Sequence, residues 1–137
     1  MMTSAFGEIR LAEPADIGQL DTLSSMRFEA WWLDEATVHV AELHGAIVGY
    51  VATTDDFFGR PFIASLFVGD LYRRRGAGSA LVTVATTERD GERVFTSTNR
   101  SNTSMQRLLH RLDWRPCGIV DGIDEGDPEL FYYYDPD

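Results

Sequence analysis

Hydrophobic residues along the chain recur at two different spacings, and the clearest change of spacing falls between residues 62 and 85. The largely apolar run Phe62–Val68 predicts a buried strand that ends at Gly69-Asp70. A helix is predicted to follow, because its apolar residues recur at helical spacing: Ala77, Ala80, Leu81, Val84 and Ala85. We expect this helix to end near Asp90-Gly91.

Upstream of this strand, the pattern predicts an edge strand, a helix and a hairpin. After a loose leader at Met1–Gly7, the predicted segments are a strand at Glu8–Ala12, a helix from Pro14 to about Arg27, and strands at Val38–Leu43 and Ala46–Thr53. Pro14 suits the first position of a helix, where its missing N–H leaves no bond unmade. His44-Gly45 suits a tight hairpin turn, because glycine tolerates a positive φ. We expect Thr54–Pro61 to form a connecting loop.

Downstream of the central helix, the pattern predicts a strand, a second helix and a final hairpin. The predicted segments are a strand at Arg93–Ser97, a polar turn at Asn99–Asn102, a helix with Met105, Leu108, Leu109 and Leu112 on its buried face, and strands at Ile119-Val120 and Leu130–Tyr134. Pro116-Cys117-Gly118 should stop that helix. This order of elements predicts an α/β fold in which a mixed sheet carries helices on both faces. The absence of repeats and linkers predicts one domain over residues 1–137.

Length and composition agree with one domain and indicate where in the cell the protein is expected. The chain has 137 residues, of which 44% are hydrophobic, and this is enough for an ordinary core. It has neither a run of about 18 apolar residues nor a leader of the secretory kind, so we expect no membrane partner and a cytoplasmic location. The single cysteine, Cys117, excludes an internal disulfide, and we interpret it as a small packing residue.

The charge is segregated along the chain. Residues 1–60 carry three arginines and ten acidic residues. Residues 61–115 carry nine arginines and five acidic residues, and residues 116–137 carry no arginine and seven acidic residues. The net charge of −10 makes nucleic acid a poor partner, whereas the basic middle suits one polyanionic cofactor. The acidic arms suit a cationic acceptor, although solvated surface would have the same composition. All twelve basic residues are arginines, which excludes lysine chemistry.

The loop between the central strand and its helix has the composition of an anion-binding site. The first N–H groups of a helix lack intrahelical acceptors and carry a partial positive charge, and Gly76 and Gly78 allow an oxyanion to approach closely. Arg73, Arg74 and Arg75 add donors that suit a ligand with several phosphates. Glycines before a helix also occur in plain turns, so the spacing by itself leaves both interpretations open.

Two motifs in the chain resemble those of the GNAT superfamily of N-acetyltransferases. The segment Leu66–Leu81 resembles the acetyl-CoA motif, an [Arg/Gln]-x-x-Gly-x-[Gly/Ala] loop after a hydrophobic strand. The family's downstream motif, Asn-x-x-Ala-x-x-Leu-Tyr-x-x-x-Gly-Phe, is matched by Asn102, Met105, Leu108, Leu109, Leu112, Asp113 and Trp114. The resemblance covers nearly the whole chain. It implies a GNAT-like fold, in which a central mixed sheet is splayed at its middle strands and carries helices on both faces.

The resemblance also implies a cosubstrate, acetyl-CoA, and the residues that bind it. These residues are Leu66, Phe67, Val68, Arg73, Arg74, Arg75, Gly76, Ala77, Gly78, Ser79 and Asn102. The pantetheine arm would pair with the main chain of Leu66 and Val68, and Asn102 would touch that arm. The amide N–H of Val68 is implied as the donor to the oxyanion of the reaction. That reaction is acetyl transfer to a primary amine by direct attack within a ternary complex.

The sequence departs from the family at both proton-transfer positions. Many members place a glutamate on the central strand as general base, whereas this chain has Ser65 there. The remaining candidates for the base are Glu29, Glu35 and His39. Where the family often has a tyrosine that protonates the CoA thiolate, the chain has Leu109, which cannot donate a proton. The run Tyr132–Tyr134 offers substitutes, unless these tyrosines simply pack on the last strand.

No motif identifies the acceptor, which we expect to be a small-molecule or peptide amine. Trp31, Asp55 and Asp56 are candidate substrate-binding residues, although core packing and a solvated turn also account for them. We expect no metal, because neither His39 nor His44 has a second ligand at metal-binding spacing. A homodimer is compatible with the sequence. Two alternatives to an enzyme stay open: a CoA-binding sensor or regulatory module, and a structural domain whose acidic arms bind a basic protein.

Overall fold

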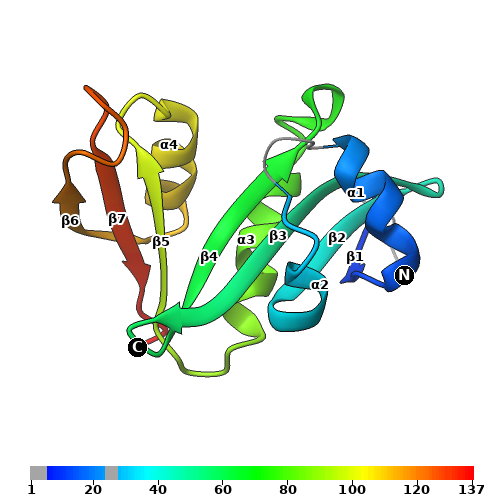
Figure 1. Cartoon of the computed structure of the whole chain (residues 1–137), viewed down its shortest axis with the longest axis horizontal. Coiled ribbons are helices and arrows are strands. Elements are labelled where there is room, and N and C mark those ends of the chain that lie inside the picture. Colours follow the sequence, from blue (N-terminus) through cyan, green and yellow to red (C-terminus); the bar gives the residue numbers. More distant parts are fainter. Residues whose placement is uncertain (1–5, 24–27) are drawn as a thin grey trace.

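The computed structural model describes residues 6–23 and 28–137, whose strands form one seven-stranded sheet (Figure 1). The strands are β1 (Glu8–Leu11), β2 (Thr37–Leu43), β3 (Ala46–Phe57), β4 (Arg60–Val68), β5 (Val94–Asn99), β6 (Arg115–Val120) and β7 (Glu129–Tyr134). Their order is β1-β2-β3-β4-β5-β7-β6. Among the described strands, β4 and β5 pair in parallel and all other neighbours pair antiparallel. The mixed sheet predicted from the sequence is confirmed.

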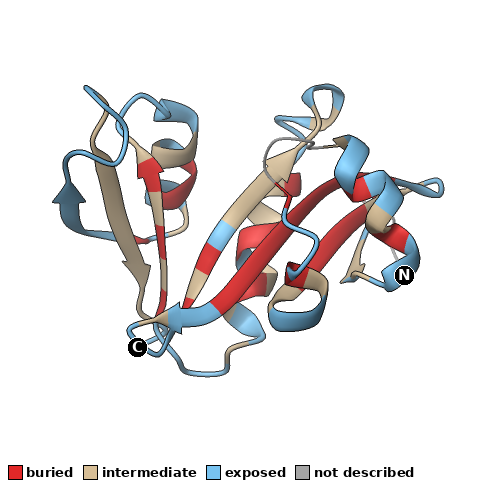
Figure 2. Cartoon of the chain, in the orientation of Figure 1, coloured by how far each residue is buried: buried red, intermediate tan, exposed pale blue. Residues whose placement is uncertain are grey.

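Helices cover both faces of this sheet, as predicted. They are α1 (Ile17–Leu23), α2 (Trp32–Glu35), α3 (Ala77–Thr87) and α4 (Thr103–Arg111), with 3₁₀ turns η1 (Pro14–Asp16) and η2 (Asp70–Tyr72). One core joins the sheet to α3 and α4 through buried residues such as Leu81 and Leu109. A second core joins the opposite face to α1 and α2 through Leu20 and Trp32. Figure 2 shows the buried residues concentrated on β2, β3 and the inner side of α3.

Local signals placed the first helix start and the first hairpin correctly. Pro14 opens η1, and Glu13 and Asp16 form a capping box around it. His44 and Gly45 join β2 to β3 with φ of 51° and 82°, which suits a tight turn. The predicted extension of the first helix to Arg27 lies outside the described residues.

The predicted loop Thr54–Pro61 is instead the tip of a second hairpin. β3 continues to Phe57, the chain turns at Phe58-Gly59 with positive φ at both residues, and β4 begins at Arg60. The strand extends this far because the Phe57 ring stacks on Phe62, with the ring centroids 4.8 Å apart. The polar composition of the segment predicted a loop, and aromatic packing across the strands outweighs it.

Both long helices end earlier than the sequence predicted. α3 ends at Thr87, ahead of the Asp90-Gly91 turn, where both residues have positive φ. α4 ends at Arg111, and a left-handed residue at Asp113, with φ of 65°, redirects the chain. The segment Pro116-Cys117-Gly118 therefore belongs to β6 and does not stop the helix. Cys117 is exposed there, which corrects its interpretation as a packing residue.

β4 and β5 separate soon after they pair. The pairs between them among the described residues are Phe62 with Phe95 and Ile63 with Thr96, although β4 runs on to Val68. Beyond Ile63 the two strands diverge, and α4 lies beside the open end of the gap (Figure 1). The splay implied by the family resemblance is present. The gap leaves main-chain groups unpaired in the middle of the sheet.

Candidate active site

The main chain at the end of β4 faces the gap between β4 and β5. The N–H of Gly69 donates to the carbonyl oxygen of Val48 at 2.8 Å, so the peptide groups of Gly69 face β3. Main-chain groups alternate in direction along an antiparallel strand, so those of Val68 and Leu66 point away from β3. They point to the side from which β5 has diverged. An amide chain in the gap would pair with them as an added strand does.

The loop after β4 ends in a helix start that no described side chain caps. Gly76 is the N-cap of α3 in a left-handed conformation, with φ of 89°, and the cap makes no side-chain hydrogen bond. Arg74 is also left-handed, with φ of 64°, a strained conformation for a residue other than glycine. The first N–H groups of α3, near Gly78 and Ser79, therefore stay available where the helix dipole favours an anion.

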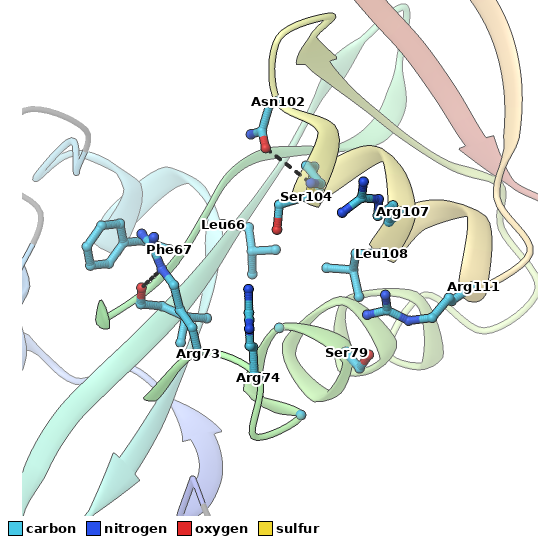
Figure 3. Close-up of a pocket in the computed structure, with 14 residues that line it drawn as sticks. Leu66, Phe67, Arg73, Arg74, Ser79, Asn102, Ser104, Arg107, Leu108 and Arg111 are labelled. Carbon is cyan, nitrogen blue, oxygen red and sulfur yellow. Dashed lines mark hydrogen bonds between the residues drawn. The ribbon is translucent and has the colours of Figure 1, made fainter. Parts of the chain in front are cut away.

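A pocket of about 720 Å³ lies between this loop and α4 (Figure 3). It is lined by Leu66, Phe67, Val68, Arg73, Arg74, Gly76, Gly78, Ser79, Asn102, Ser104, Met105, Arg107, Leu108 and Arg111. The cofactor residues expected from the sequence are all among them except Arg75 and Ala77. Ala77 is 1% exposed, and the guanidinium of Arg75 lies over the Tyr72 ring, 5.6 Å from its centroid. These two residues therefore face elsewhere.

The lining of this pocket, which we call the basic pocket, is strongly positive. The arginines in it are Arg73, Arg74, Arg107 and Arg111. No carboxylate is found among the described residues of the lining. Figure 3 shows the two guanidinium groups of α4 extending toward the loop that carries the other two. Arg73 also donates through Nε to the Val68 carbonyl oxygen at 3.0 Å and pairs with Asp70 at 3.1 Å, so it ties the loop to β4. Guanidinium groups in this number suit a ligand with several phosphates.

Sequence reasoning missed Arg107 and Arg111. The helical pattern identified the buried side of α4, including Leu108 and Leu109, and left the opposite side to solvent. Residues four apart share one face of a helix, so Arg107 and Arg111 project together. Two arginines four residues apart on a helix that follows the basic loop of the family motif could have indicated that both face the same anionic ligand.

Asn102 has a structural role as well as a place in the basic pocket. It is the N-cap of α4, and its Oδ1 accepts a hydrogen bond from the Met105 N–H at 3.1 Å. The cap fixes where α4 begins and so helps to position the arginines of that helix. Because the side-chain oxygen is used by the cap, the amide NH₂ group is the part that a ligand would contact. The expected contact with pantetheine stays a prediction.

A second pocket, of about 610 Å³, reaches the same gap, and we call it the acidic pocket. It is lined by Glu29, Trp32, Ile63, Ala64, Ser65, Leu66, Thr96, Ser97, Thr98, Asn99, Ser101, Asn102, Met105 and Glu129. Its described lining contains two carboxylates and no basic side chain. Leu66, Asn102 and Met105 line both pockets, so the two pockets meet in the gap between β4 and β5.

The acceptor residues predicted from the sequence do not line the acidic pocket. Trp31 is 45% exposed and lies outside it, whereas its neighbour Trp32 is buried and lines it. Asp55 lies at the closed end of the gap, beyond the last β4–β5 pairs, and forms an ion pair with Arg89 at 2.6 Å. Asp56 is exposed beside it. The structure thus separates these three residues from the place where the pockets meet.

The structure distinguishes the three candidates for the general base. Glu29 lines the acidic pocket, whereas Glu35 is exposed on α2 and lines neither pocket. His39 is 4% exposed on β2, and burial lowers the pKa of its imidazole. It also lines neither pocket. Sequence reasoning missed Glu129, which lines the acidic pocket from β7, because it ends the acidic stretch Asp121–Glu129 ahead of the strand predicted at Leu130–Tyr134.

No tyrosine is found among the described residues that line either pocket. Leu109, at the family's tyrosine position, is fully buried in the core. Tyr132 and Tyr134 pack at the edge of the same core, and the Tyr133 ring lies under the guanidinium groups of Arg93 and Arg115. The described residues of the last strand therefore bring no tyrosine to the gap.

In the part of the chain that the structure describes, no helix is long and apolar enough to cross a membrane. No group of three or more His, Cys, Asp or Glu side chains there is placed to hold a metal ion.

Comparisons with known proteins agree with this geometry. The sequence model of the acetyltransferase (GNAT) family matches residues 6–114. The chain therefore belongs to the GNAT acetyltransferase family, and the resemblance seen in its sequence is confirmed. A search of curated proteins found no significant match.

Solved structures share the fold over almost the whole chain. A GNAT-family acetyltransferase from Bacillus cereus ATCC 10987 is 26% identical, with a TM-score of 0.83, over 93% of this chain and 96% of that one. NAA60 from Arabidopsis thaliana in complex with acetyl-CoA is 17% identical, with a TM-score of 0.80, over 94% and 98%. The same protein with a bisubstrate analogue gives the same identity and score over 93% and 97%. An N-acetyltransferase from Staphylococcus aureus Mu50 is 16% identical, with a TM-score of 0.73, over 93% and 97%.

Proposed function

We propose that the chain, as a single domain, transfers the acetyl group of acetyl-CoA to a primary amine by direct attack within a ternary complex. The observation that carries the proposal is the meeting of two pockets of opposite charge in the gap between β4 and β5. Four arginines line one pocket, two carboxylates line the other, and Leu66, Asn102 and Met105 line both. A polyphosphate donor and an ammonium-bearing acceptor each suit one pocket. Their reacting ends would meet at the shared residues.

The basic pocket supplies each part of a CoA site. The uncapped N-terminus of α3, with Gly76 and Gly78, would hold the pyrophosphate through main-chain N–H groups, and the four arginines would neutralise its charge. The main chain of Leu66 and the carbonyl oxygen of Val68, which also accepts from Arg73 Nε, would pair with the amides of the pantetheine arm, so that the N–H of Val68 stays available for the oxyanion. This pairing would direct the thioester into the gap, where the acidic pocket begins.

The acceptor must lose a proton before it can attack. An aliphatic ammonium has a pKa near 10.4, so only about one molecule in 2,500 is neutral at pH 7. We assign the removal of this proton to Glu29, the base candidate that lines the acidic pocket. The neutral nitrogen then attacks the thioester carbonyl, and the N–H of Val68 donates to the developing oxyanion. The C–N bond forms, the second amine proton leaves to solvent, the C–S bond breaks, and CoA departs as its thiolate.

The thiolate would depart without help from a protein acid. A thiol has a pKa near 8.5, so its thiolate is a tolerable leaving group that takes its proton from solvent. Because Leu109 is buried and no described tyrosine lines the gap, we expect a rate on the order of 10²-fold below that of an enzyme with a general acid.

The direct route is also supported by a protein of the same fold. A bisubstrate analogue joins donor and acceptor in one molecule, and Arabidopsis thaliana NAA60 has been solved with one. That protein holds both halves at once, as a ternary complex requires. We therefore propose that a small or peptide amine and acetyl-CoA bind this chain together.

Calorimetric binding of acetyl-CoA to a Gly78→Glu variant tests the proposal. A Cβ at Gly78 would lie 3.4 Å from Leu108 Cδ2, an ordinary contact, so the helix accepts a side chain there. The new carboxylate would point at the phosphates, and we expect binding to weaken at least about 100-fold. Gly18→Glu, on α1 where an added Cβ meets nothing within 4 Å, adds the same charge and should bind normally. Wild-type affinity in Gly78→Glu would refute the basic pocket as the CoA site.

A second candidate function is a CoA-binding sensor, which the buried Leu109 and the lack of a described tyrosine in the gap favour. Thiol release from acetyl-CoA in the presence of a broad panel of amines distinguishes the two functions. Turnover of any amine above the uncatalysed rate excludes the sensor. Tight acetyl-CoA binding with no turnover over the whole panel supports it.

A further inference from the structure

We infer that the acceptor is a small diamine or polyamine, whose reacting ammonium group faces Glu29 while Glu129 holds a second ammonium group that stays charged. The inference rests on the proposed acetyl transfer and names its substrate class. Both carboxylates line the acidic pocket, although Glu29 precedes α2 and Glu129 begins β7, far apart in the sequence. They have different surroundings, and these give them different roles.

Glu29 lies shortly before α2 and lines the acidic pocket beside β4. It directly follows Phe28, which is buried and whose ring lies 5.3 Å from that of Tyr50. Tyr50 is the strand partner of Phe67, at the end of β4 between the two residues whose main chain faces the gap. Glu29 lines the acidic pocket together with Ser65 and Leu66 of β4, and we assign it the proton of the attacking nitrogen.

Glu129 lies on the opposite wall. It is the first residue of β7 and pairs with Asn99, the last residue of β5. β5 lies between β7 and the gap, so Glu129 is one strand further from β4 than the edge of the gap itself. Glu129 is therefore farther from the reacting end of the acceptor than β4 is, and its carboxylate suits an ammonium group of the acceptor that does not react.

A hydroxyl on a largely buried side chain also marks this pocket as a site for a polar ligand. Thr96 donates through Oγ1 to the Ile63 carbonyl oxygen at 2.9 Å, across the point where β4 and β5 still pair. Thr98 follows on the same face of β5, where β4 has already diverged. It is 6% exposed and lines the acidic pocket, and its hydroxyl bonds to no residue that the structure describes. The Thr98 hydroxyl is not among the buried side-chain atoms that lack a partner, so it is accessible from the pocket, where an amine nitrogen can donate to it.

The charge balance favours two amino groups in the acceptor. The described residues of the lining include no basic side chain, and neither Glu29 nor Glu129 takes part in an ion pair with a described residue. A monoamine is neutral when it attacks and leaves Glu129 without a counter-charge. A diamine keeps one positive charge beside Glu129 throughout the reaction. The cavity of about 610 Å³ is of the size that holds small molecules.

Calorimetry with 1,4-diaminobutane and 1-aminobutane, in the presence of saturating CoA, tests the inference without requiring turnover. The two probes have the same carbon chain and differ in the second amino group. We expect wild-type protein to bind the diamine at least about tenfold more tightly. Glu129→Gln should abolish that difference and leave binding of the monoamine within about twofold. Glu125→Gln, in the exposed turn before β7, is the matched control and should keep the preference.

Steady-state kinetics with acetyl-CoA then separates this inference from the proposed function. In Glu129→Gln the KM for the diamine should rise about tenfold, with kcat within about twofold of wild type. Equal binding of the two amines by wild-type protein, or a preference that survives in Glu129→Gln, overturns the inference. Lack of turnover with either amine, combined with a diamine preference that depends on Glu129, refutes acetyl transfer to these amines and supports the binding site.

Discussion

His39 lies on the face of β2 that α3 covers, is 4% exposed, and has no hydrogen-bond partner for Nδ1 among the described residues. Burial lowers the pKa of this imidazole below its ordinary value of 6.5; nearby Arg89 lowers it further, and Glu88 opposes the shift. The folded protein therefore keeps His39 neutral at pH values at which the unfolded chain binds a proton. Its contribution to stability is complete above about pH 6.5 and is lost as the pH falls through the lowered value.

The free energy of unfolding should consequently fall more steeply below pH 6.5 in wild-type protein than in His39→Leu. One proton gives a slope of at most about 1.4 kcal/mol per pH unit, and the variant should lack this component. Urea denaturation between pH 7.5 and pH 5 measures it, above the range in which the carboxyl of Asp16, whose pKa is lowered by Arg10, takes up a proton. His110→Gln, on the exposed side of α4, should keep the wild-type slope. Parallel curves for wild type and His39→Leu would contradict the argument.

At the scale of one element, the end of α4 shows how a helix that carries site residues is terminated. The N–H of Trp114 donates to the Leu109 carbonyl oxygen at 3.0 Å, and the N–H of Asp113 donates to that of His110 at 3.1 Å. These two bonds define a Schellman motif, whose left-handed residue is usually glycine. Asp113 occupies that position with φ of 65° and places a negative charge at the negative end of the helix dipole.

Replacing Asp113 by glycine should therefore stabilise the fold by about 1 kcal/mol, because it removes both the backbone strain and the unfavourable charge. For a chain of this length we expect a rise in Tm of roughly 4 °C, measured by differential scanning calorimetry. Asp113→Asn removes only the charge and should give a smaller rise. Asp113→Ala also removes the charge, but alanine tolerates the left-handed φ less well than aspartate or asparagine, so it should give no rise. A Tm for Asp113→Gly at or below that of Asp113→Ala would show that the backbone conformation costs nothing.

Over the whole molecule, local features were predictable from the sequence and the positions of long-range partners were not. The strand at Phe62–Val68 and the loop that follows it are determined by short-range periodicity and by glycine and arginine chemistry, so most of the basic pocket could be predicted. Arg107 faces that pocket only because α4 packs beside the gap, which depends on the pairing of β5 with β7. Glu129 reaches the acidic pocket through the same pairing. The segment Thr54–Pro61 was predicted as a loop because the ring contacts that stabilise it include those of Phe57 with Phe95 and Phe131, which lie on strands distant in the sequence.

The charge distribution of the folded molecule leads to a last prediction. A chain with a net charge of −10 repels a polyanionic ligand at long range, so binding must depend on the local field of the basic pocket. Arg107→Gln combined with Arg111→Gln should weaken acetyl-CoA binding by about 10²-fold and reduce its dependence on salt between 50 mM and 300 mM, as measured by calorimetry. Arg100→Gln, exposed ahead of α4 and outside both pockets, is the matched control. If the double variant binds as tightly as the control, α4 contributes shape but no charge to the site, and the loop after β4 must hold the phosphates alone.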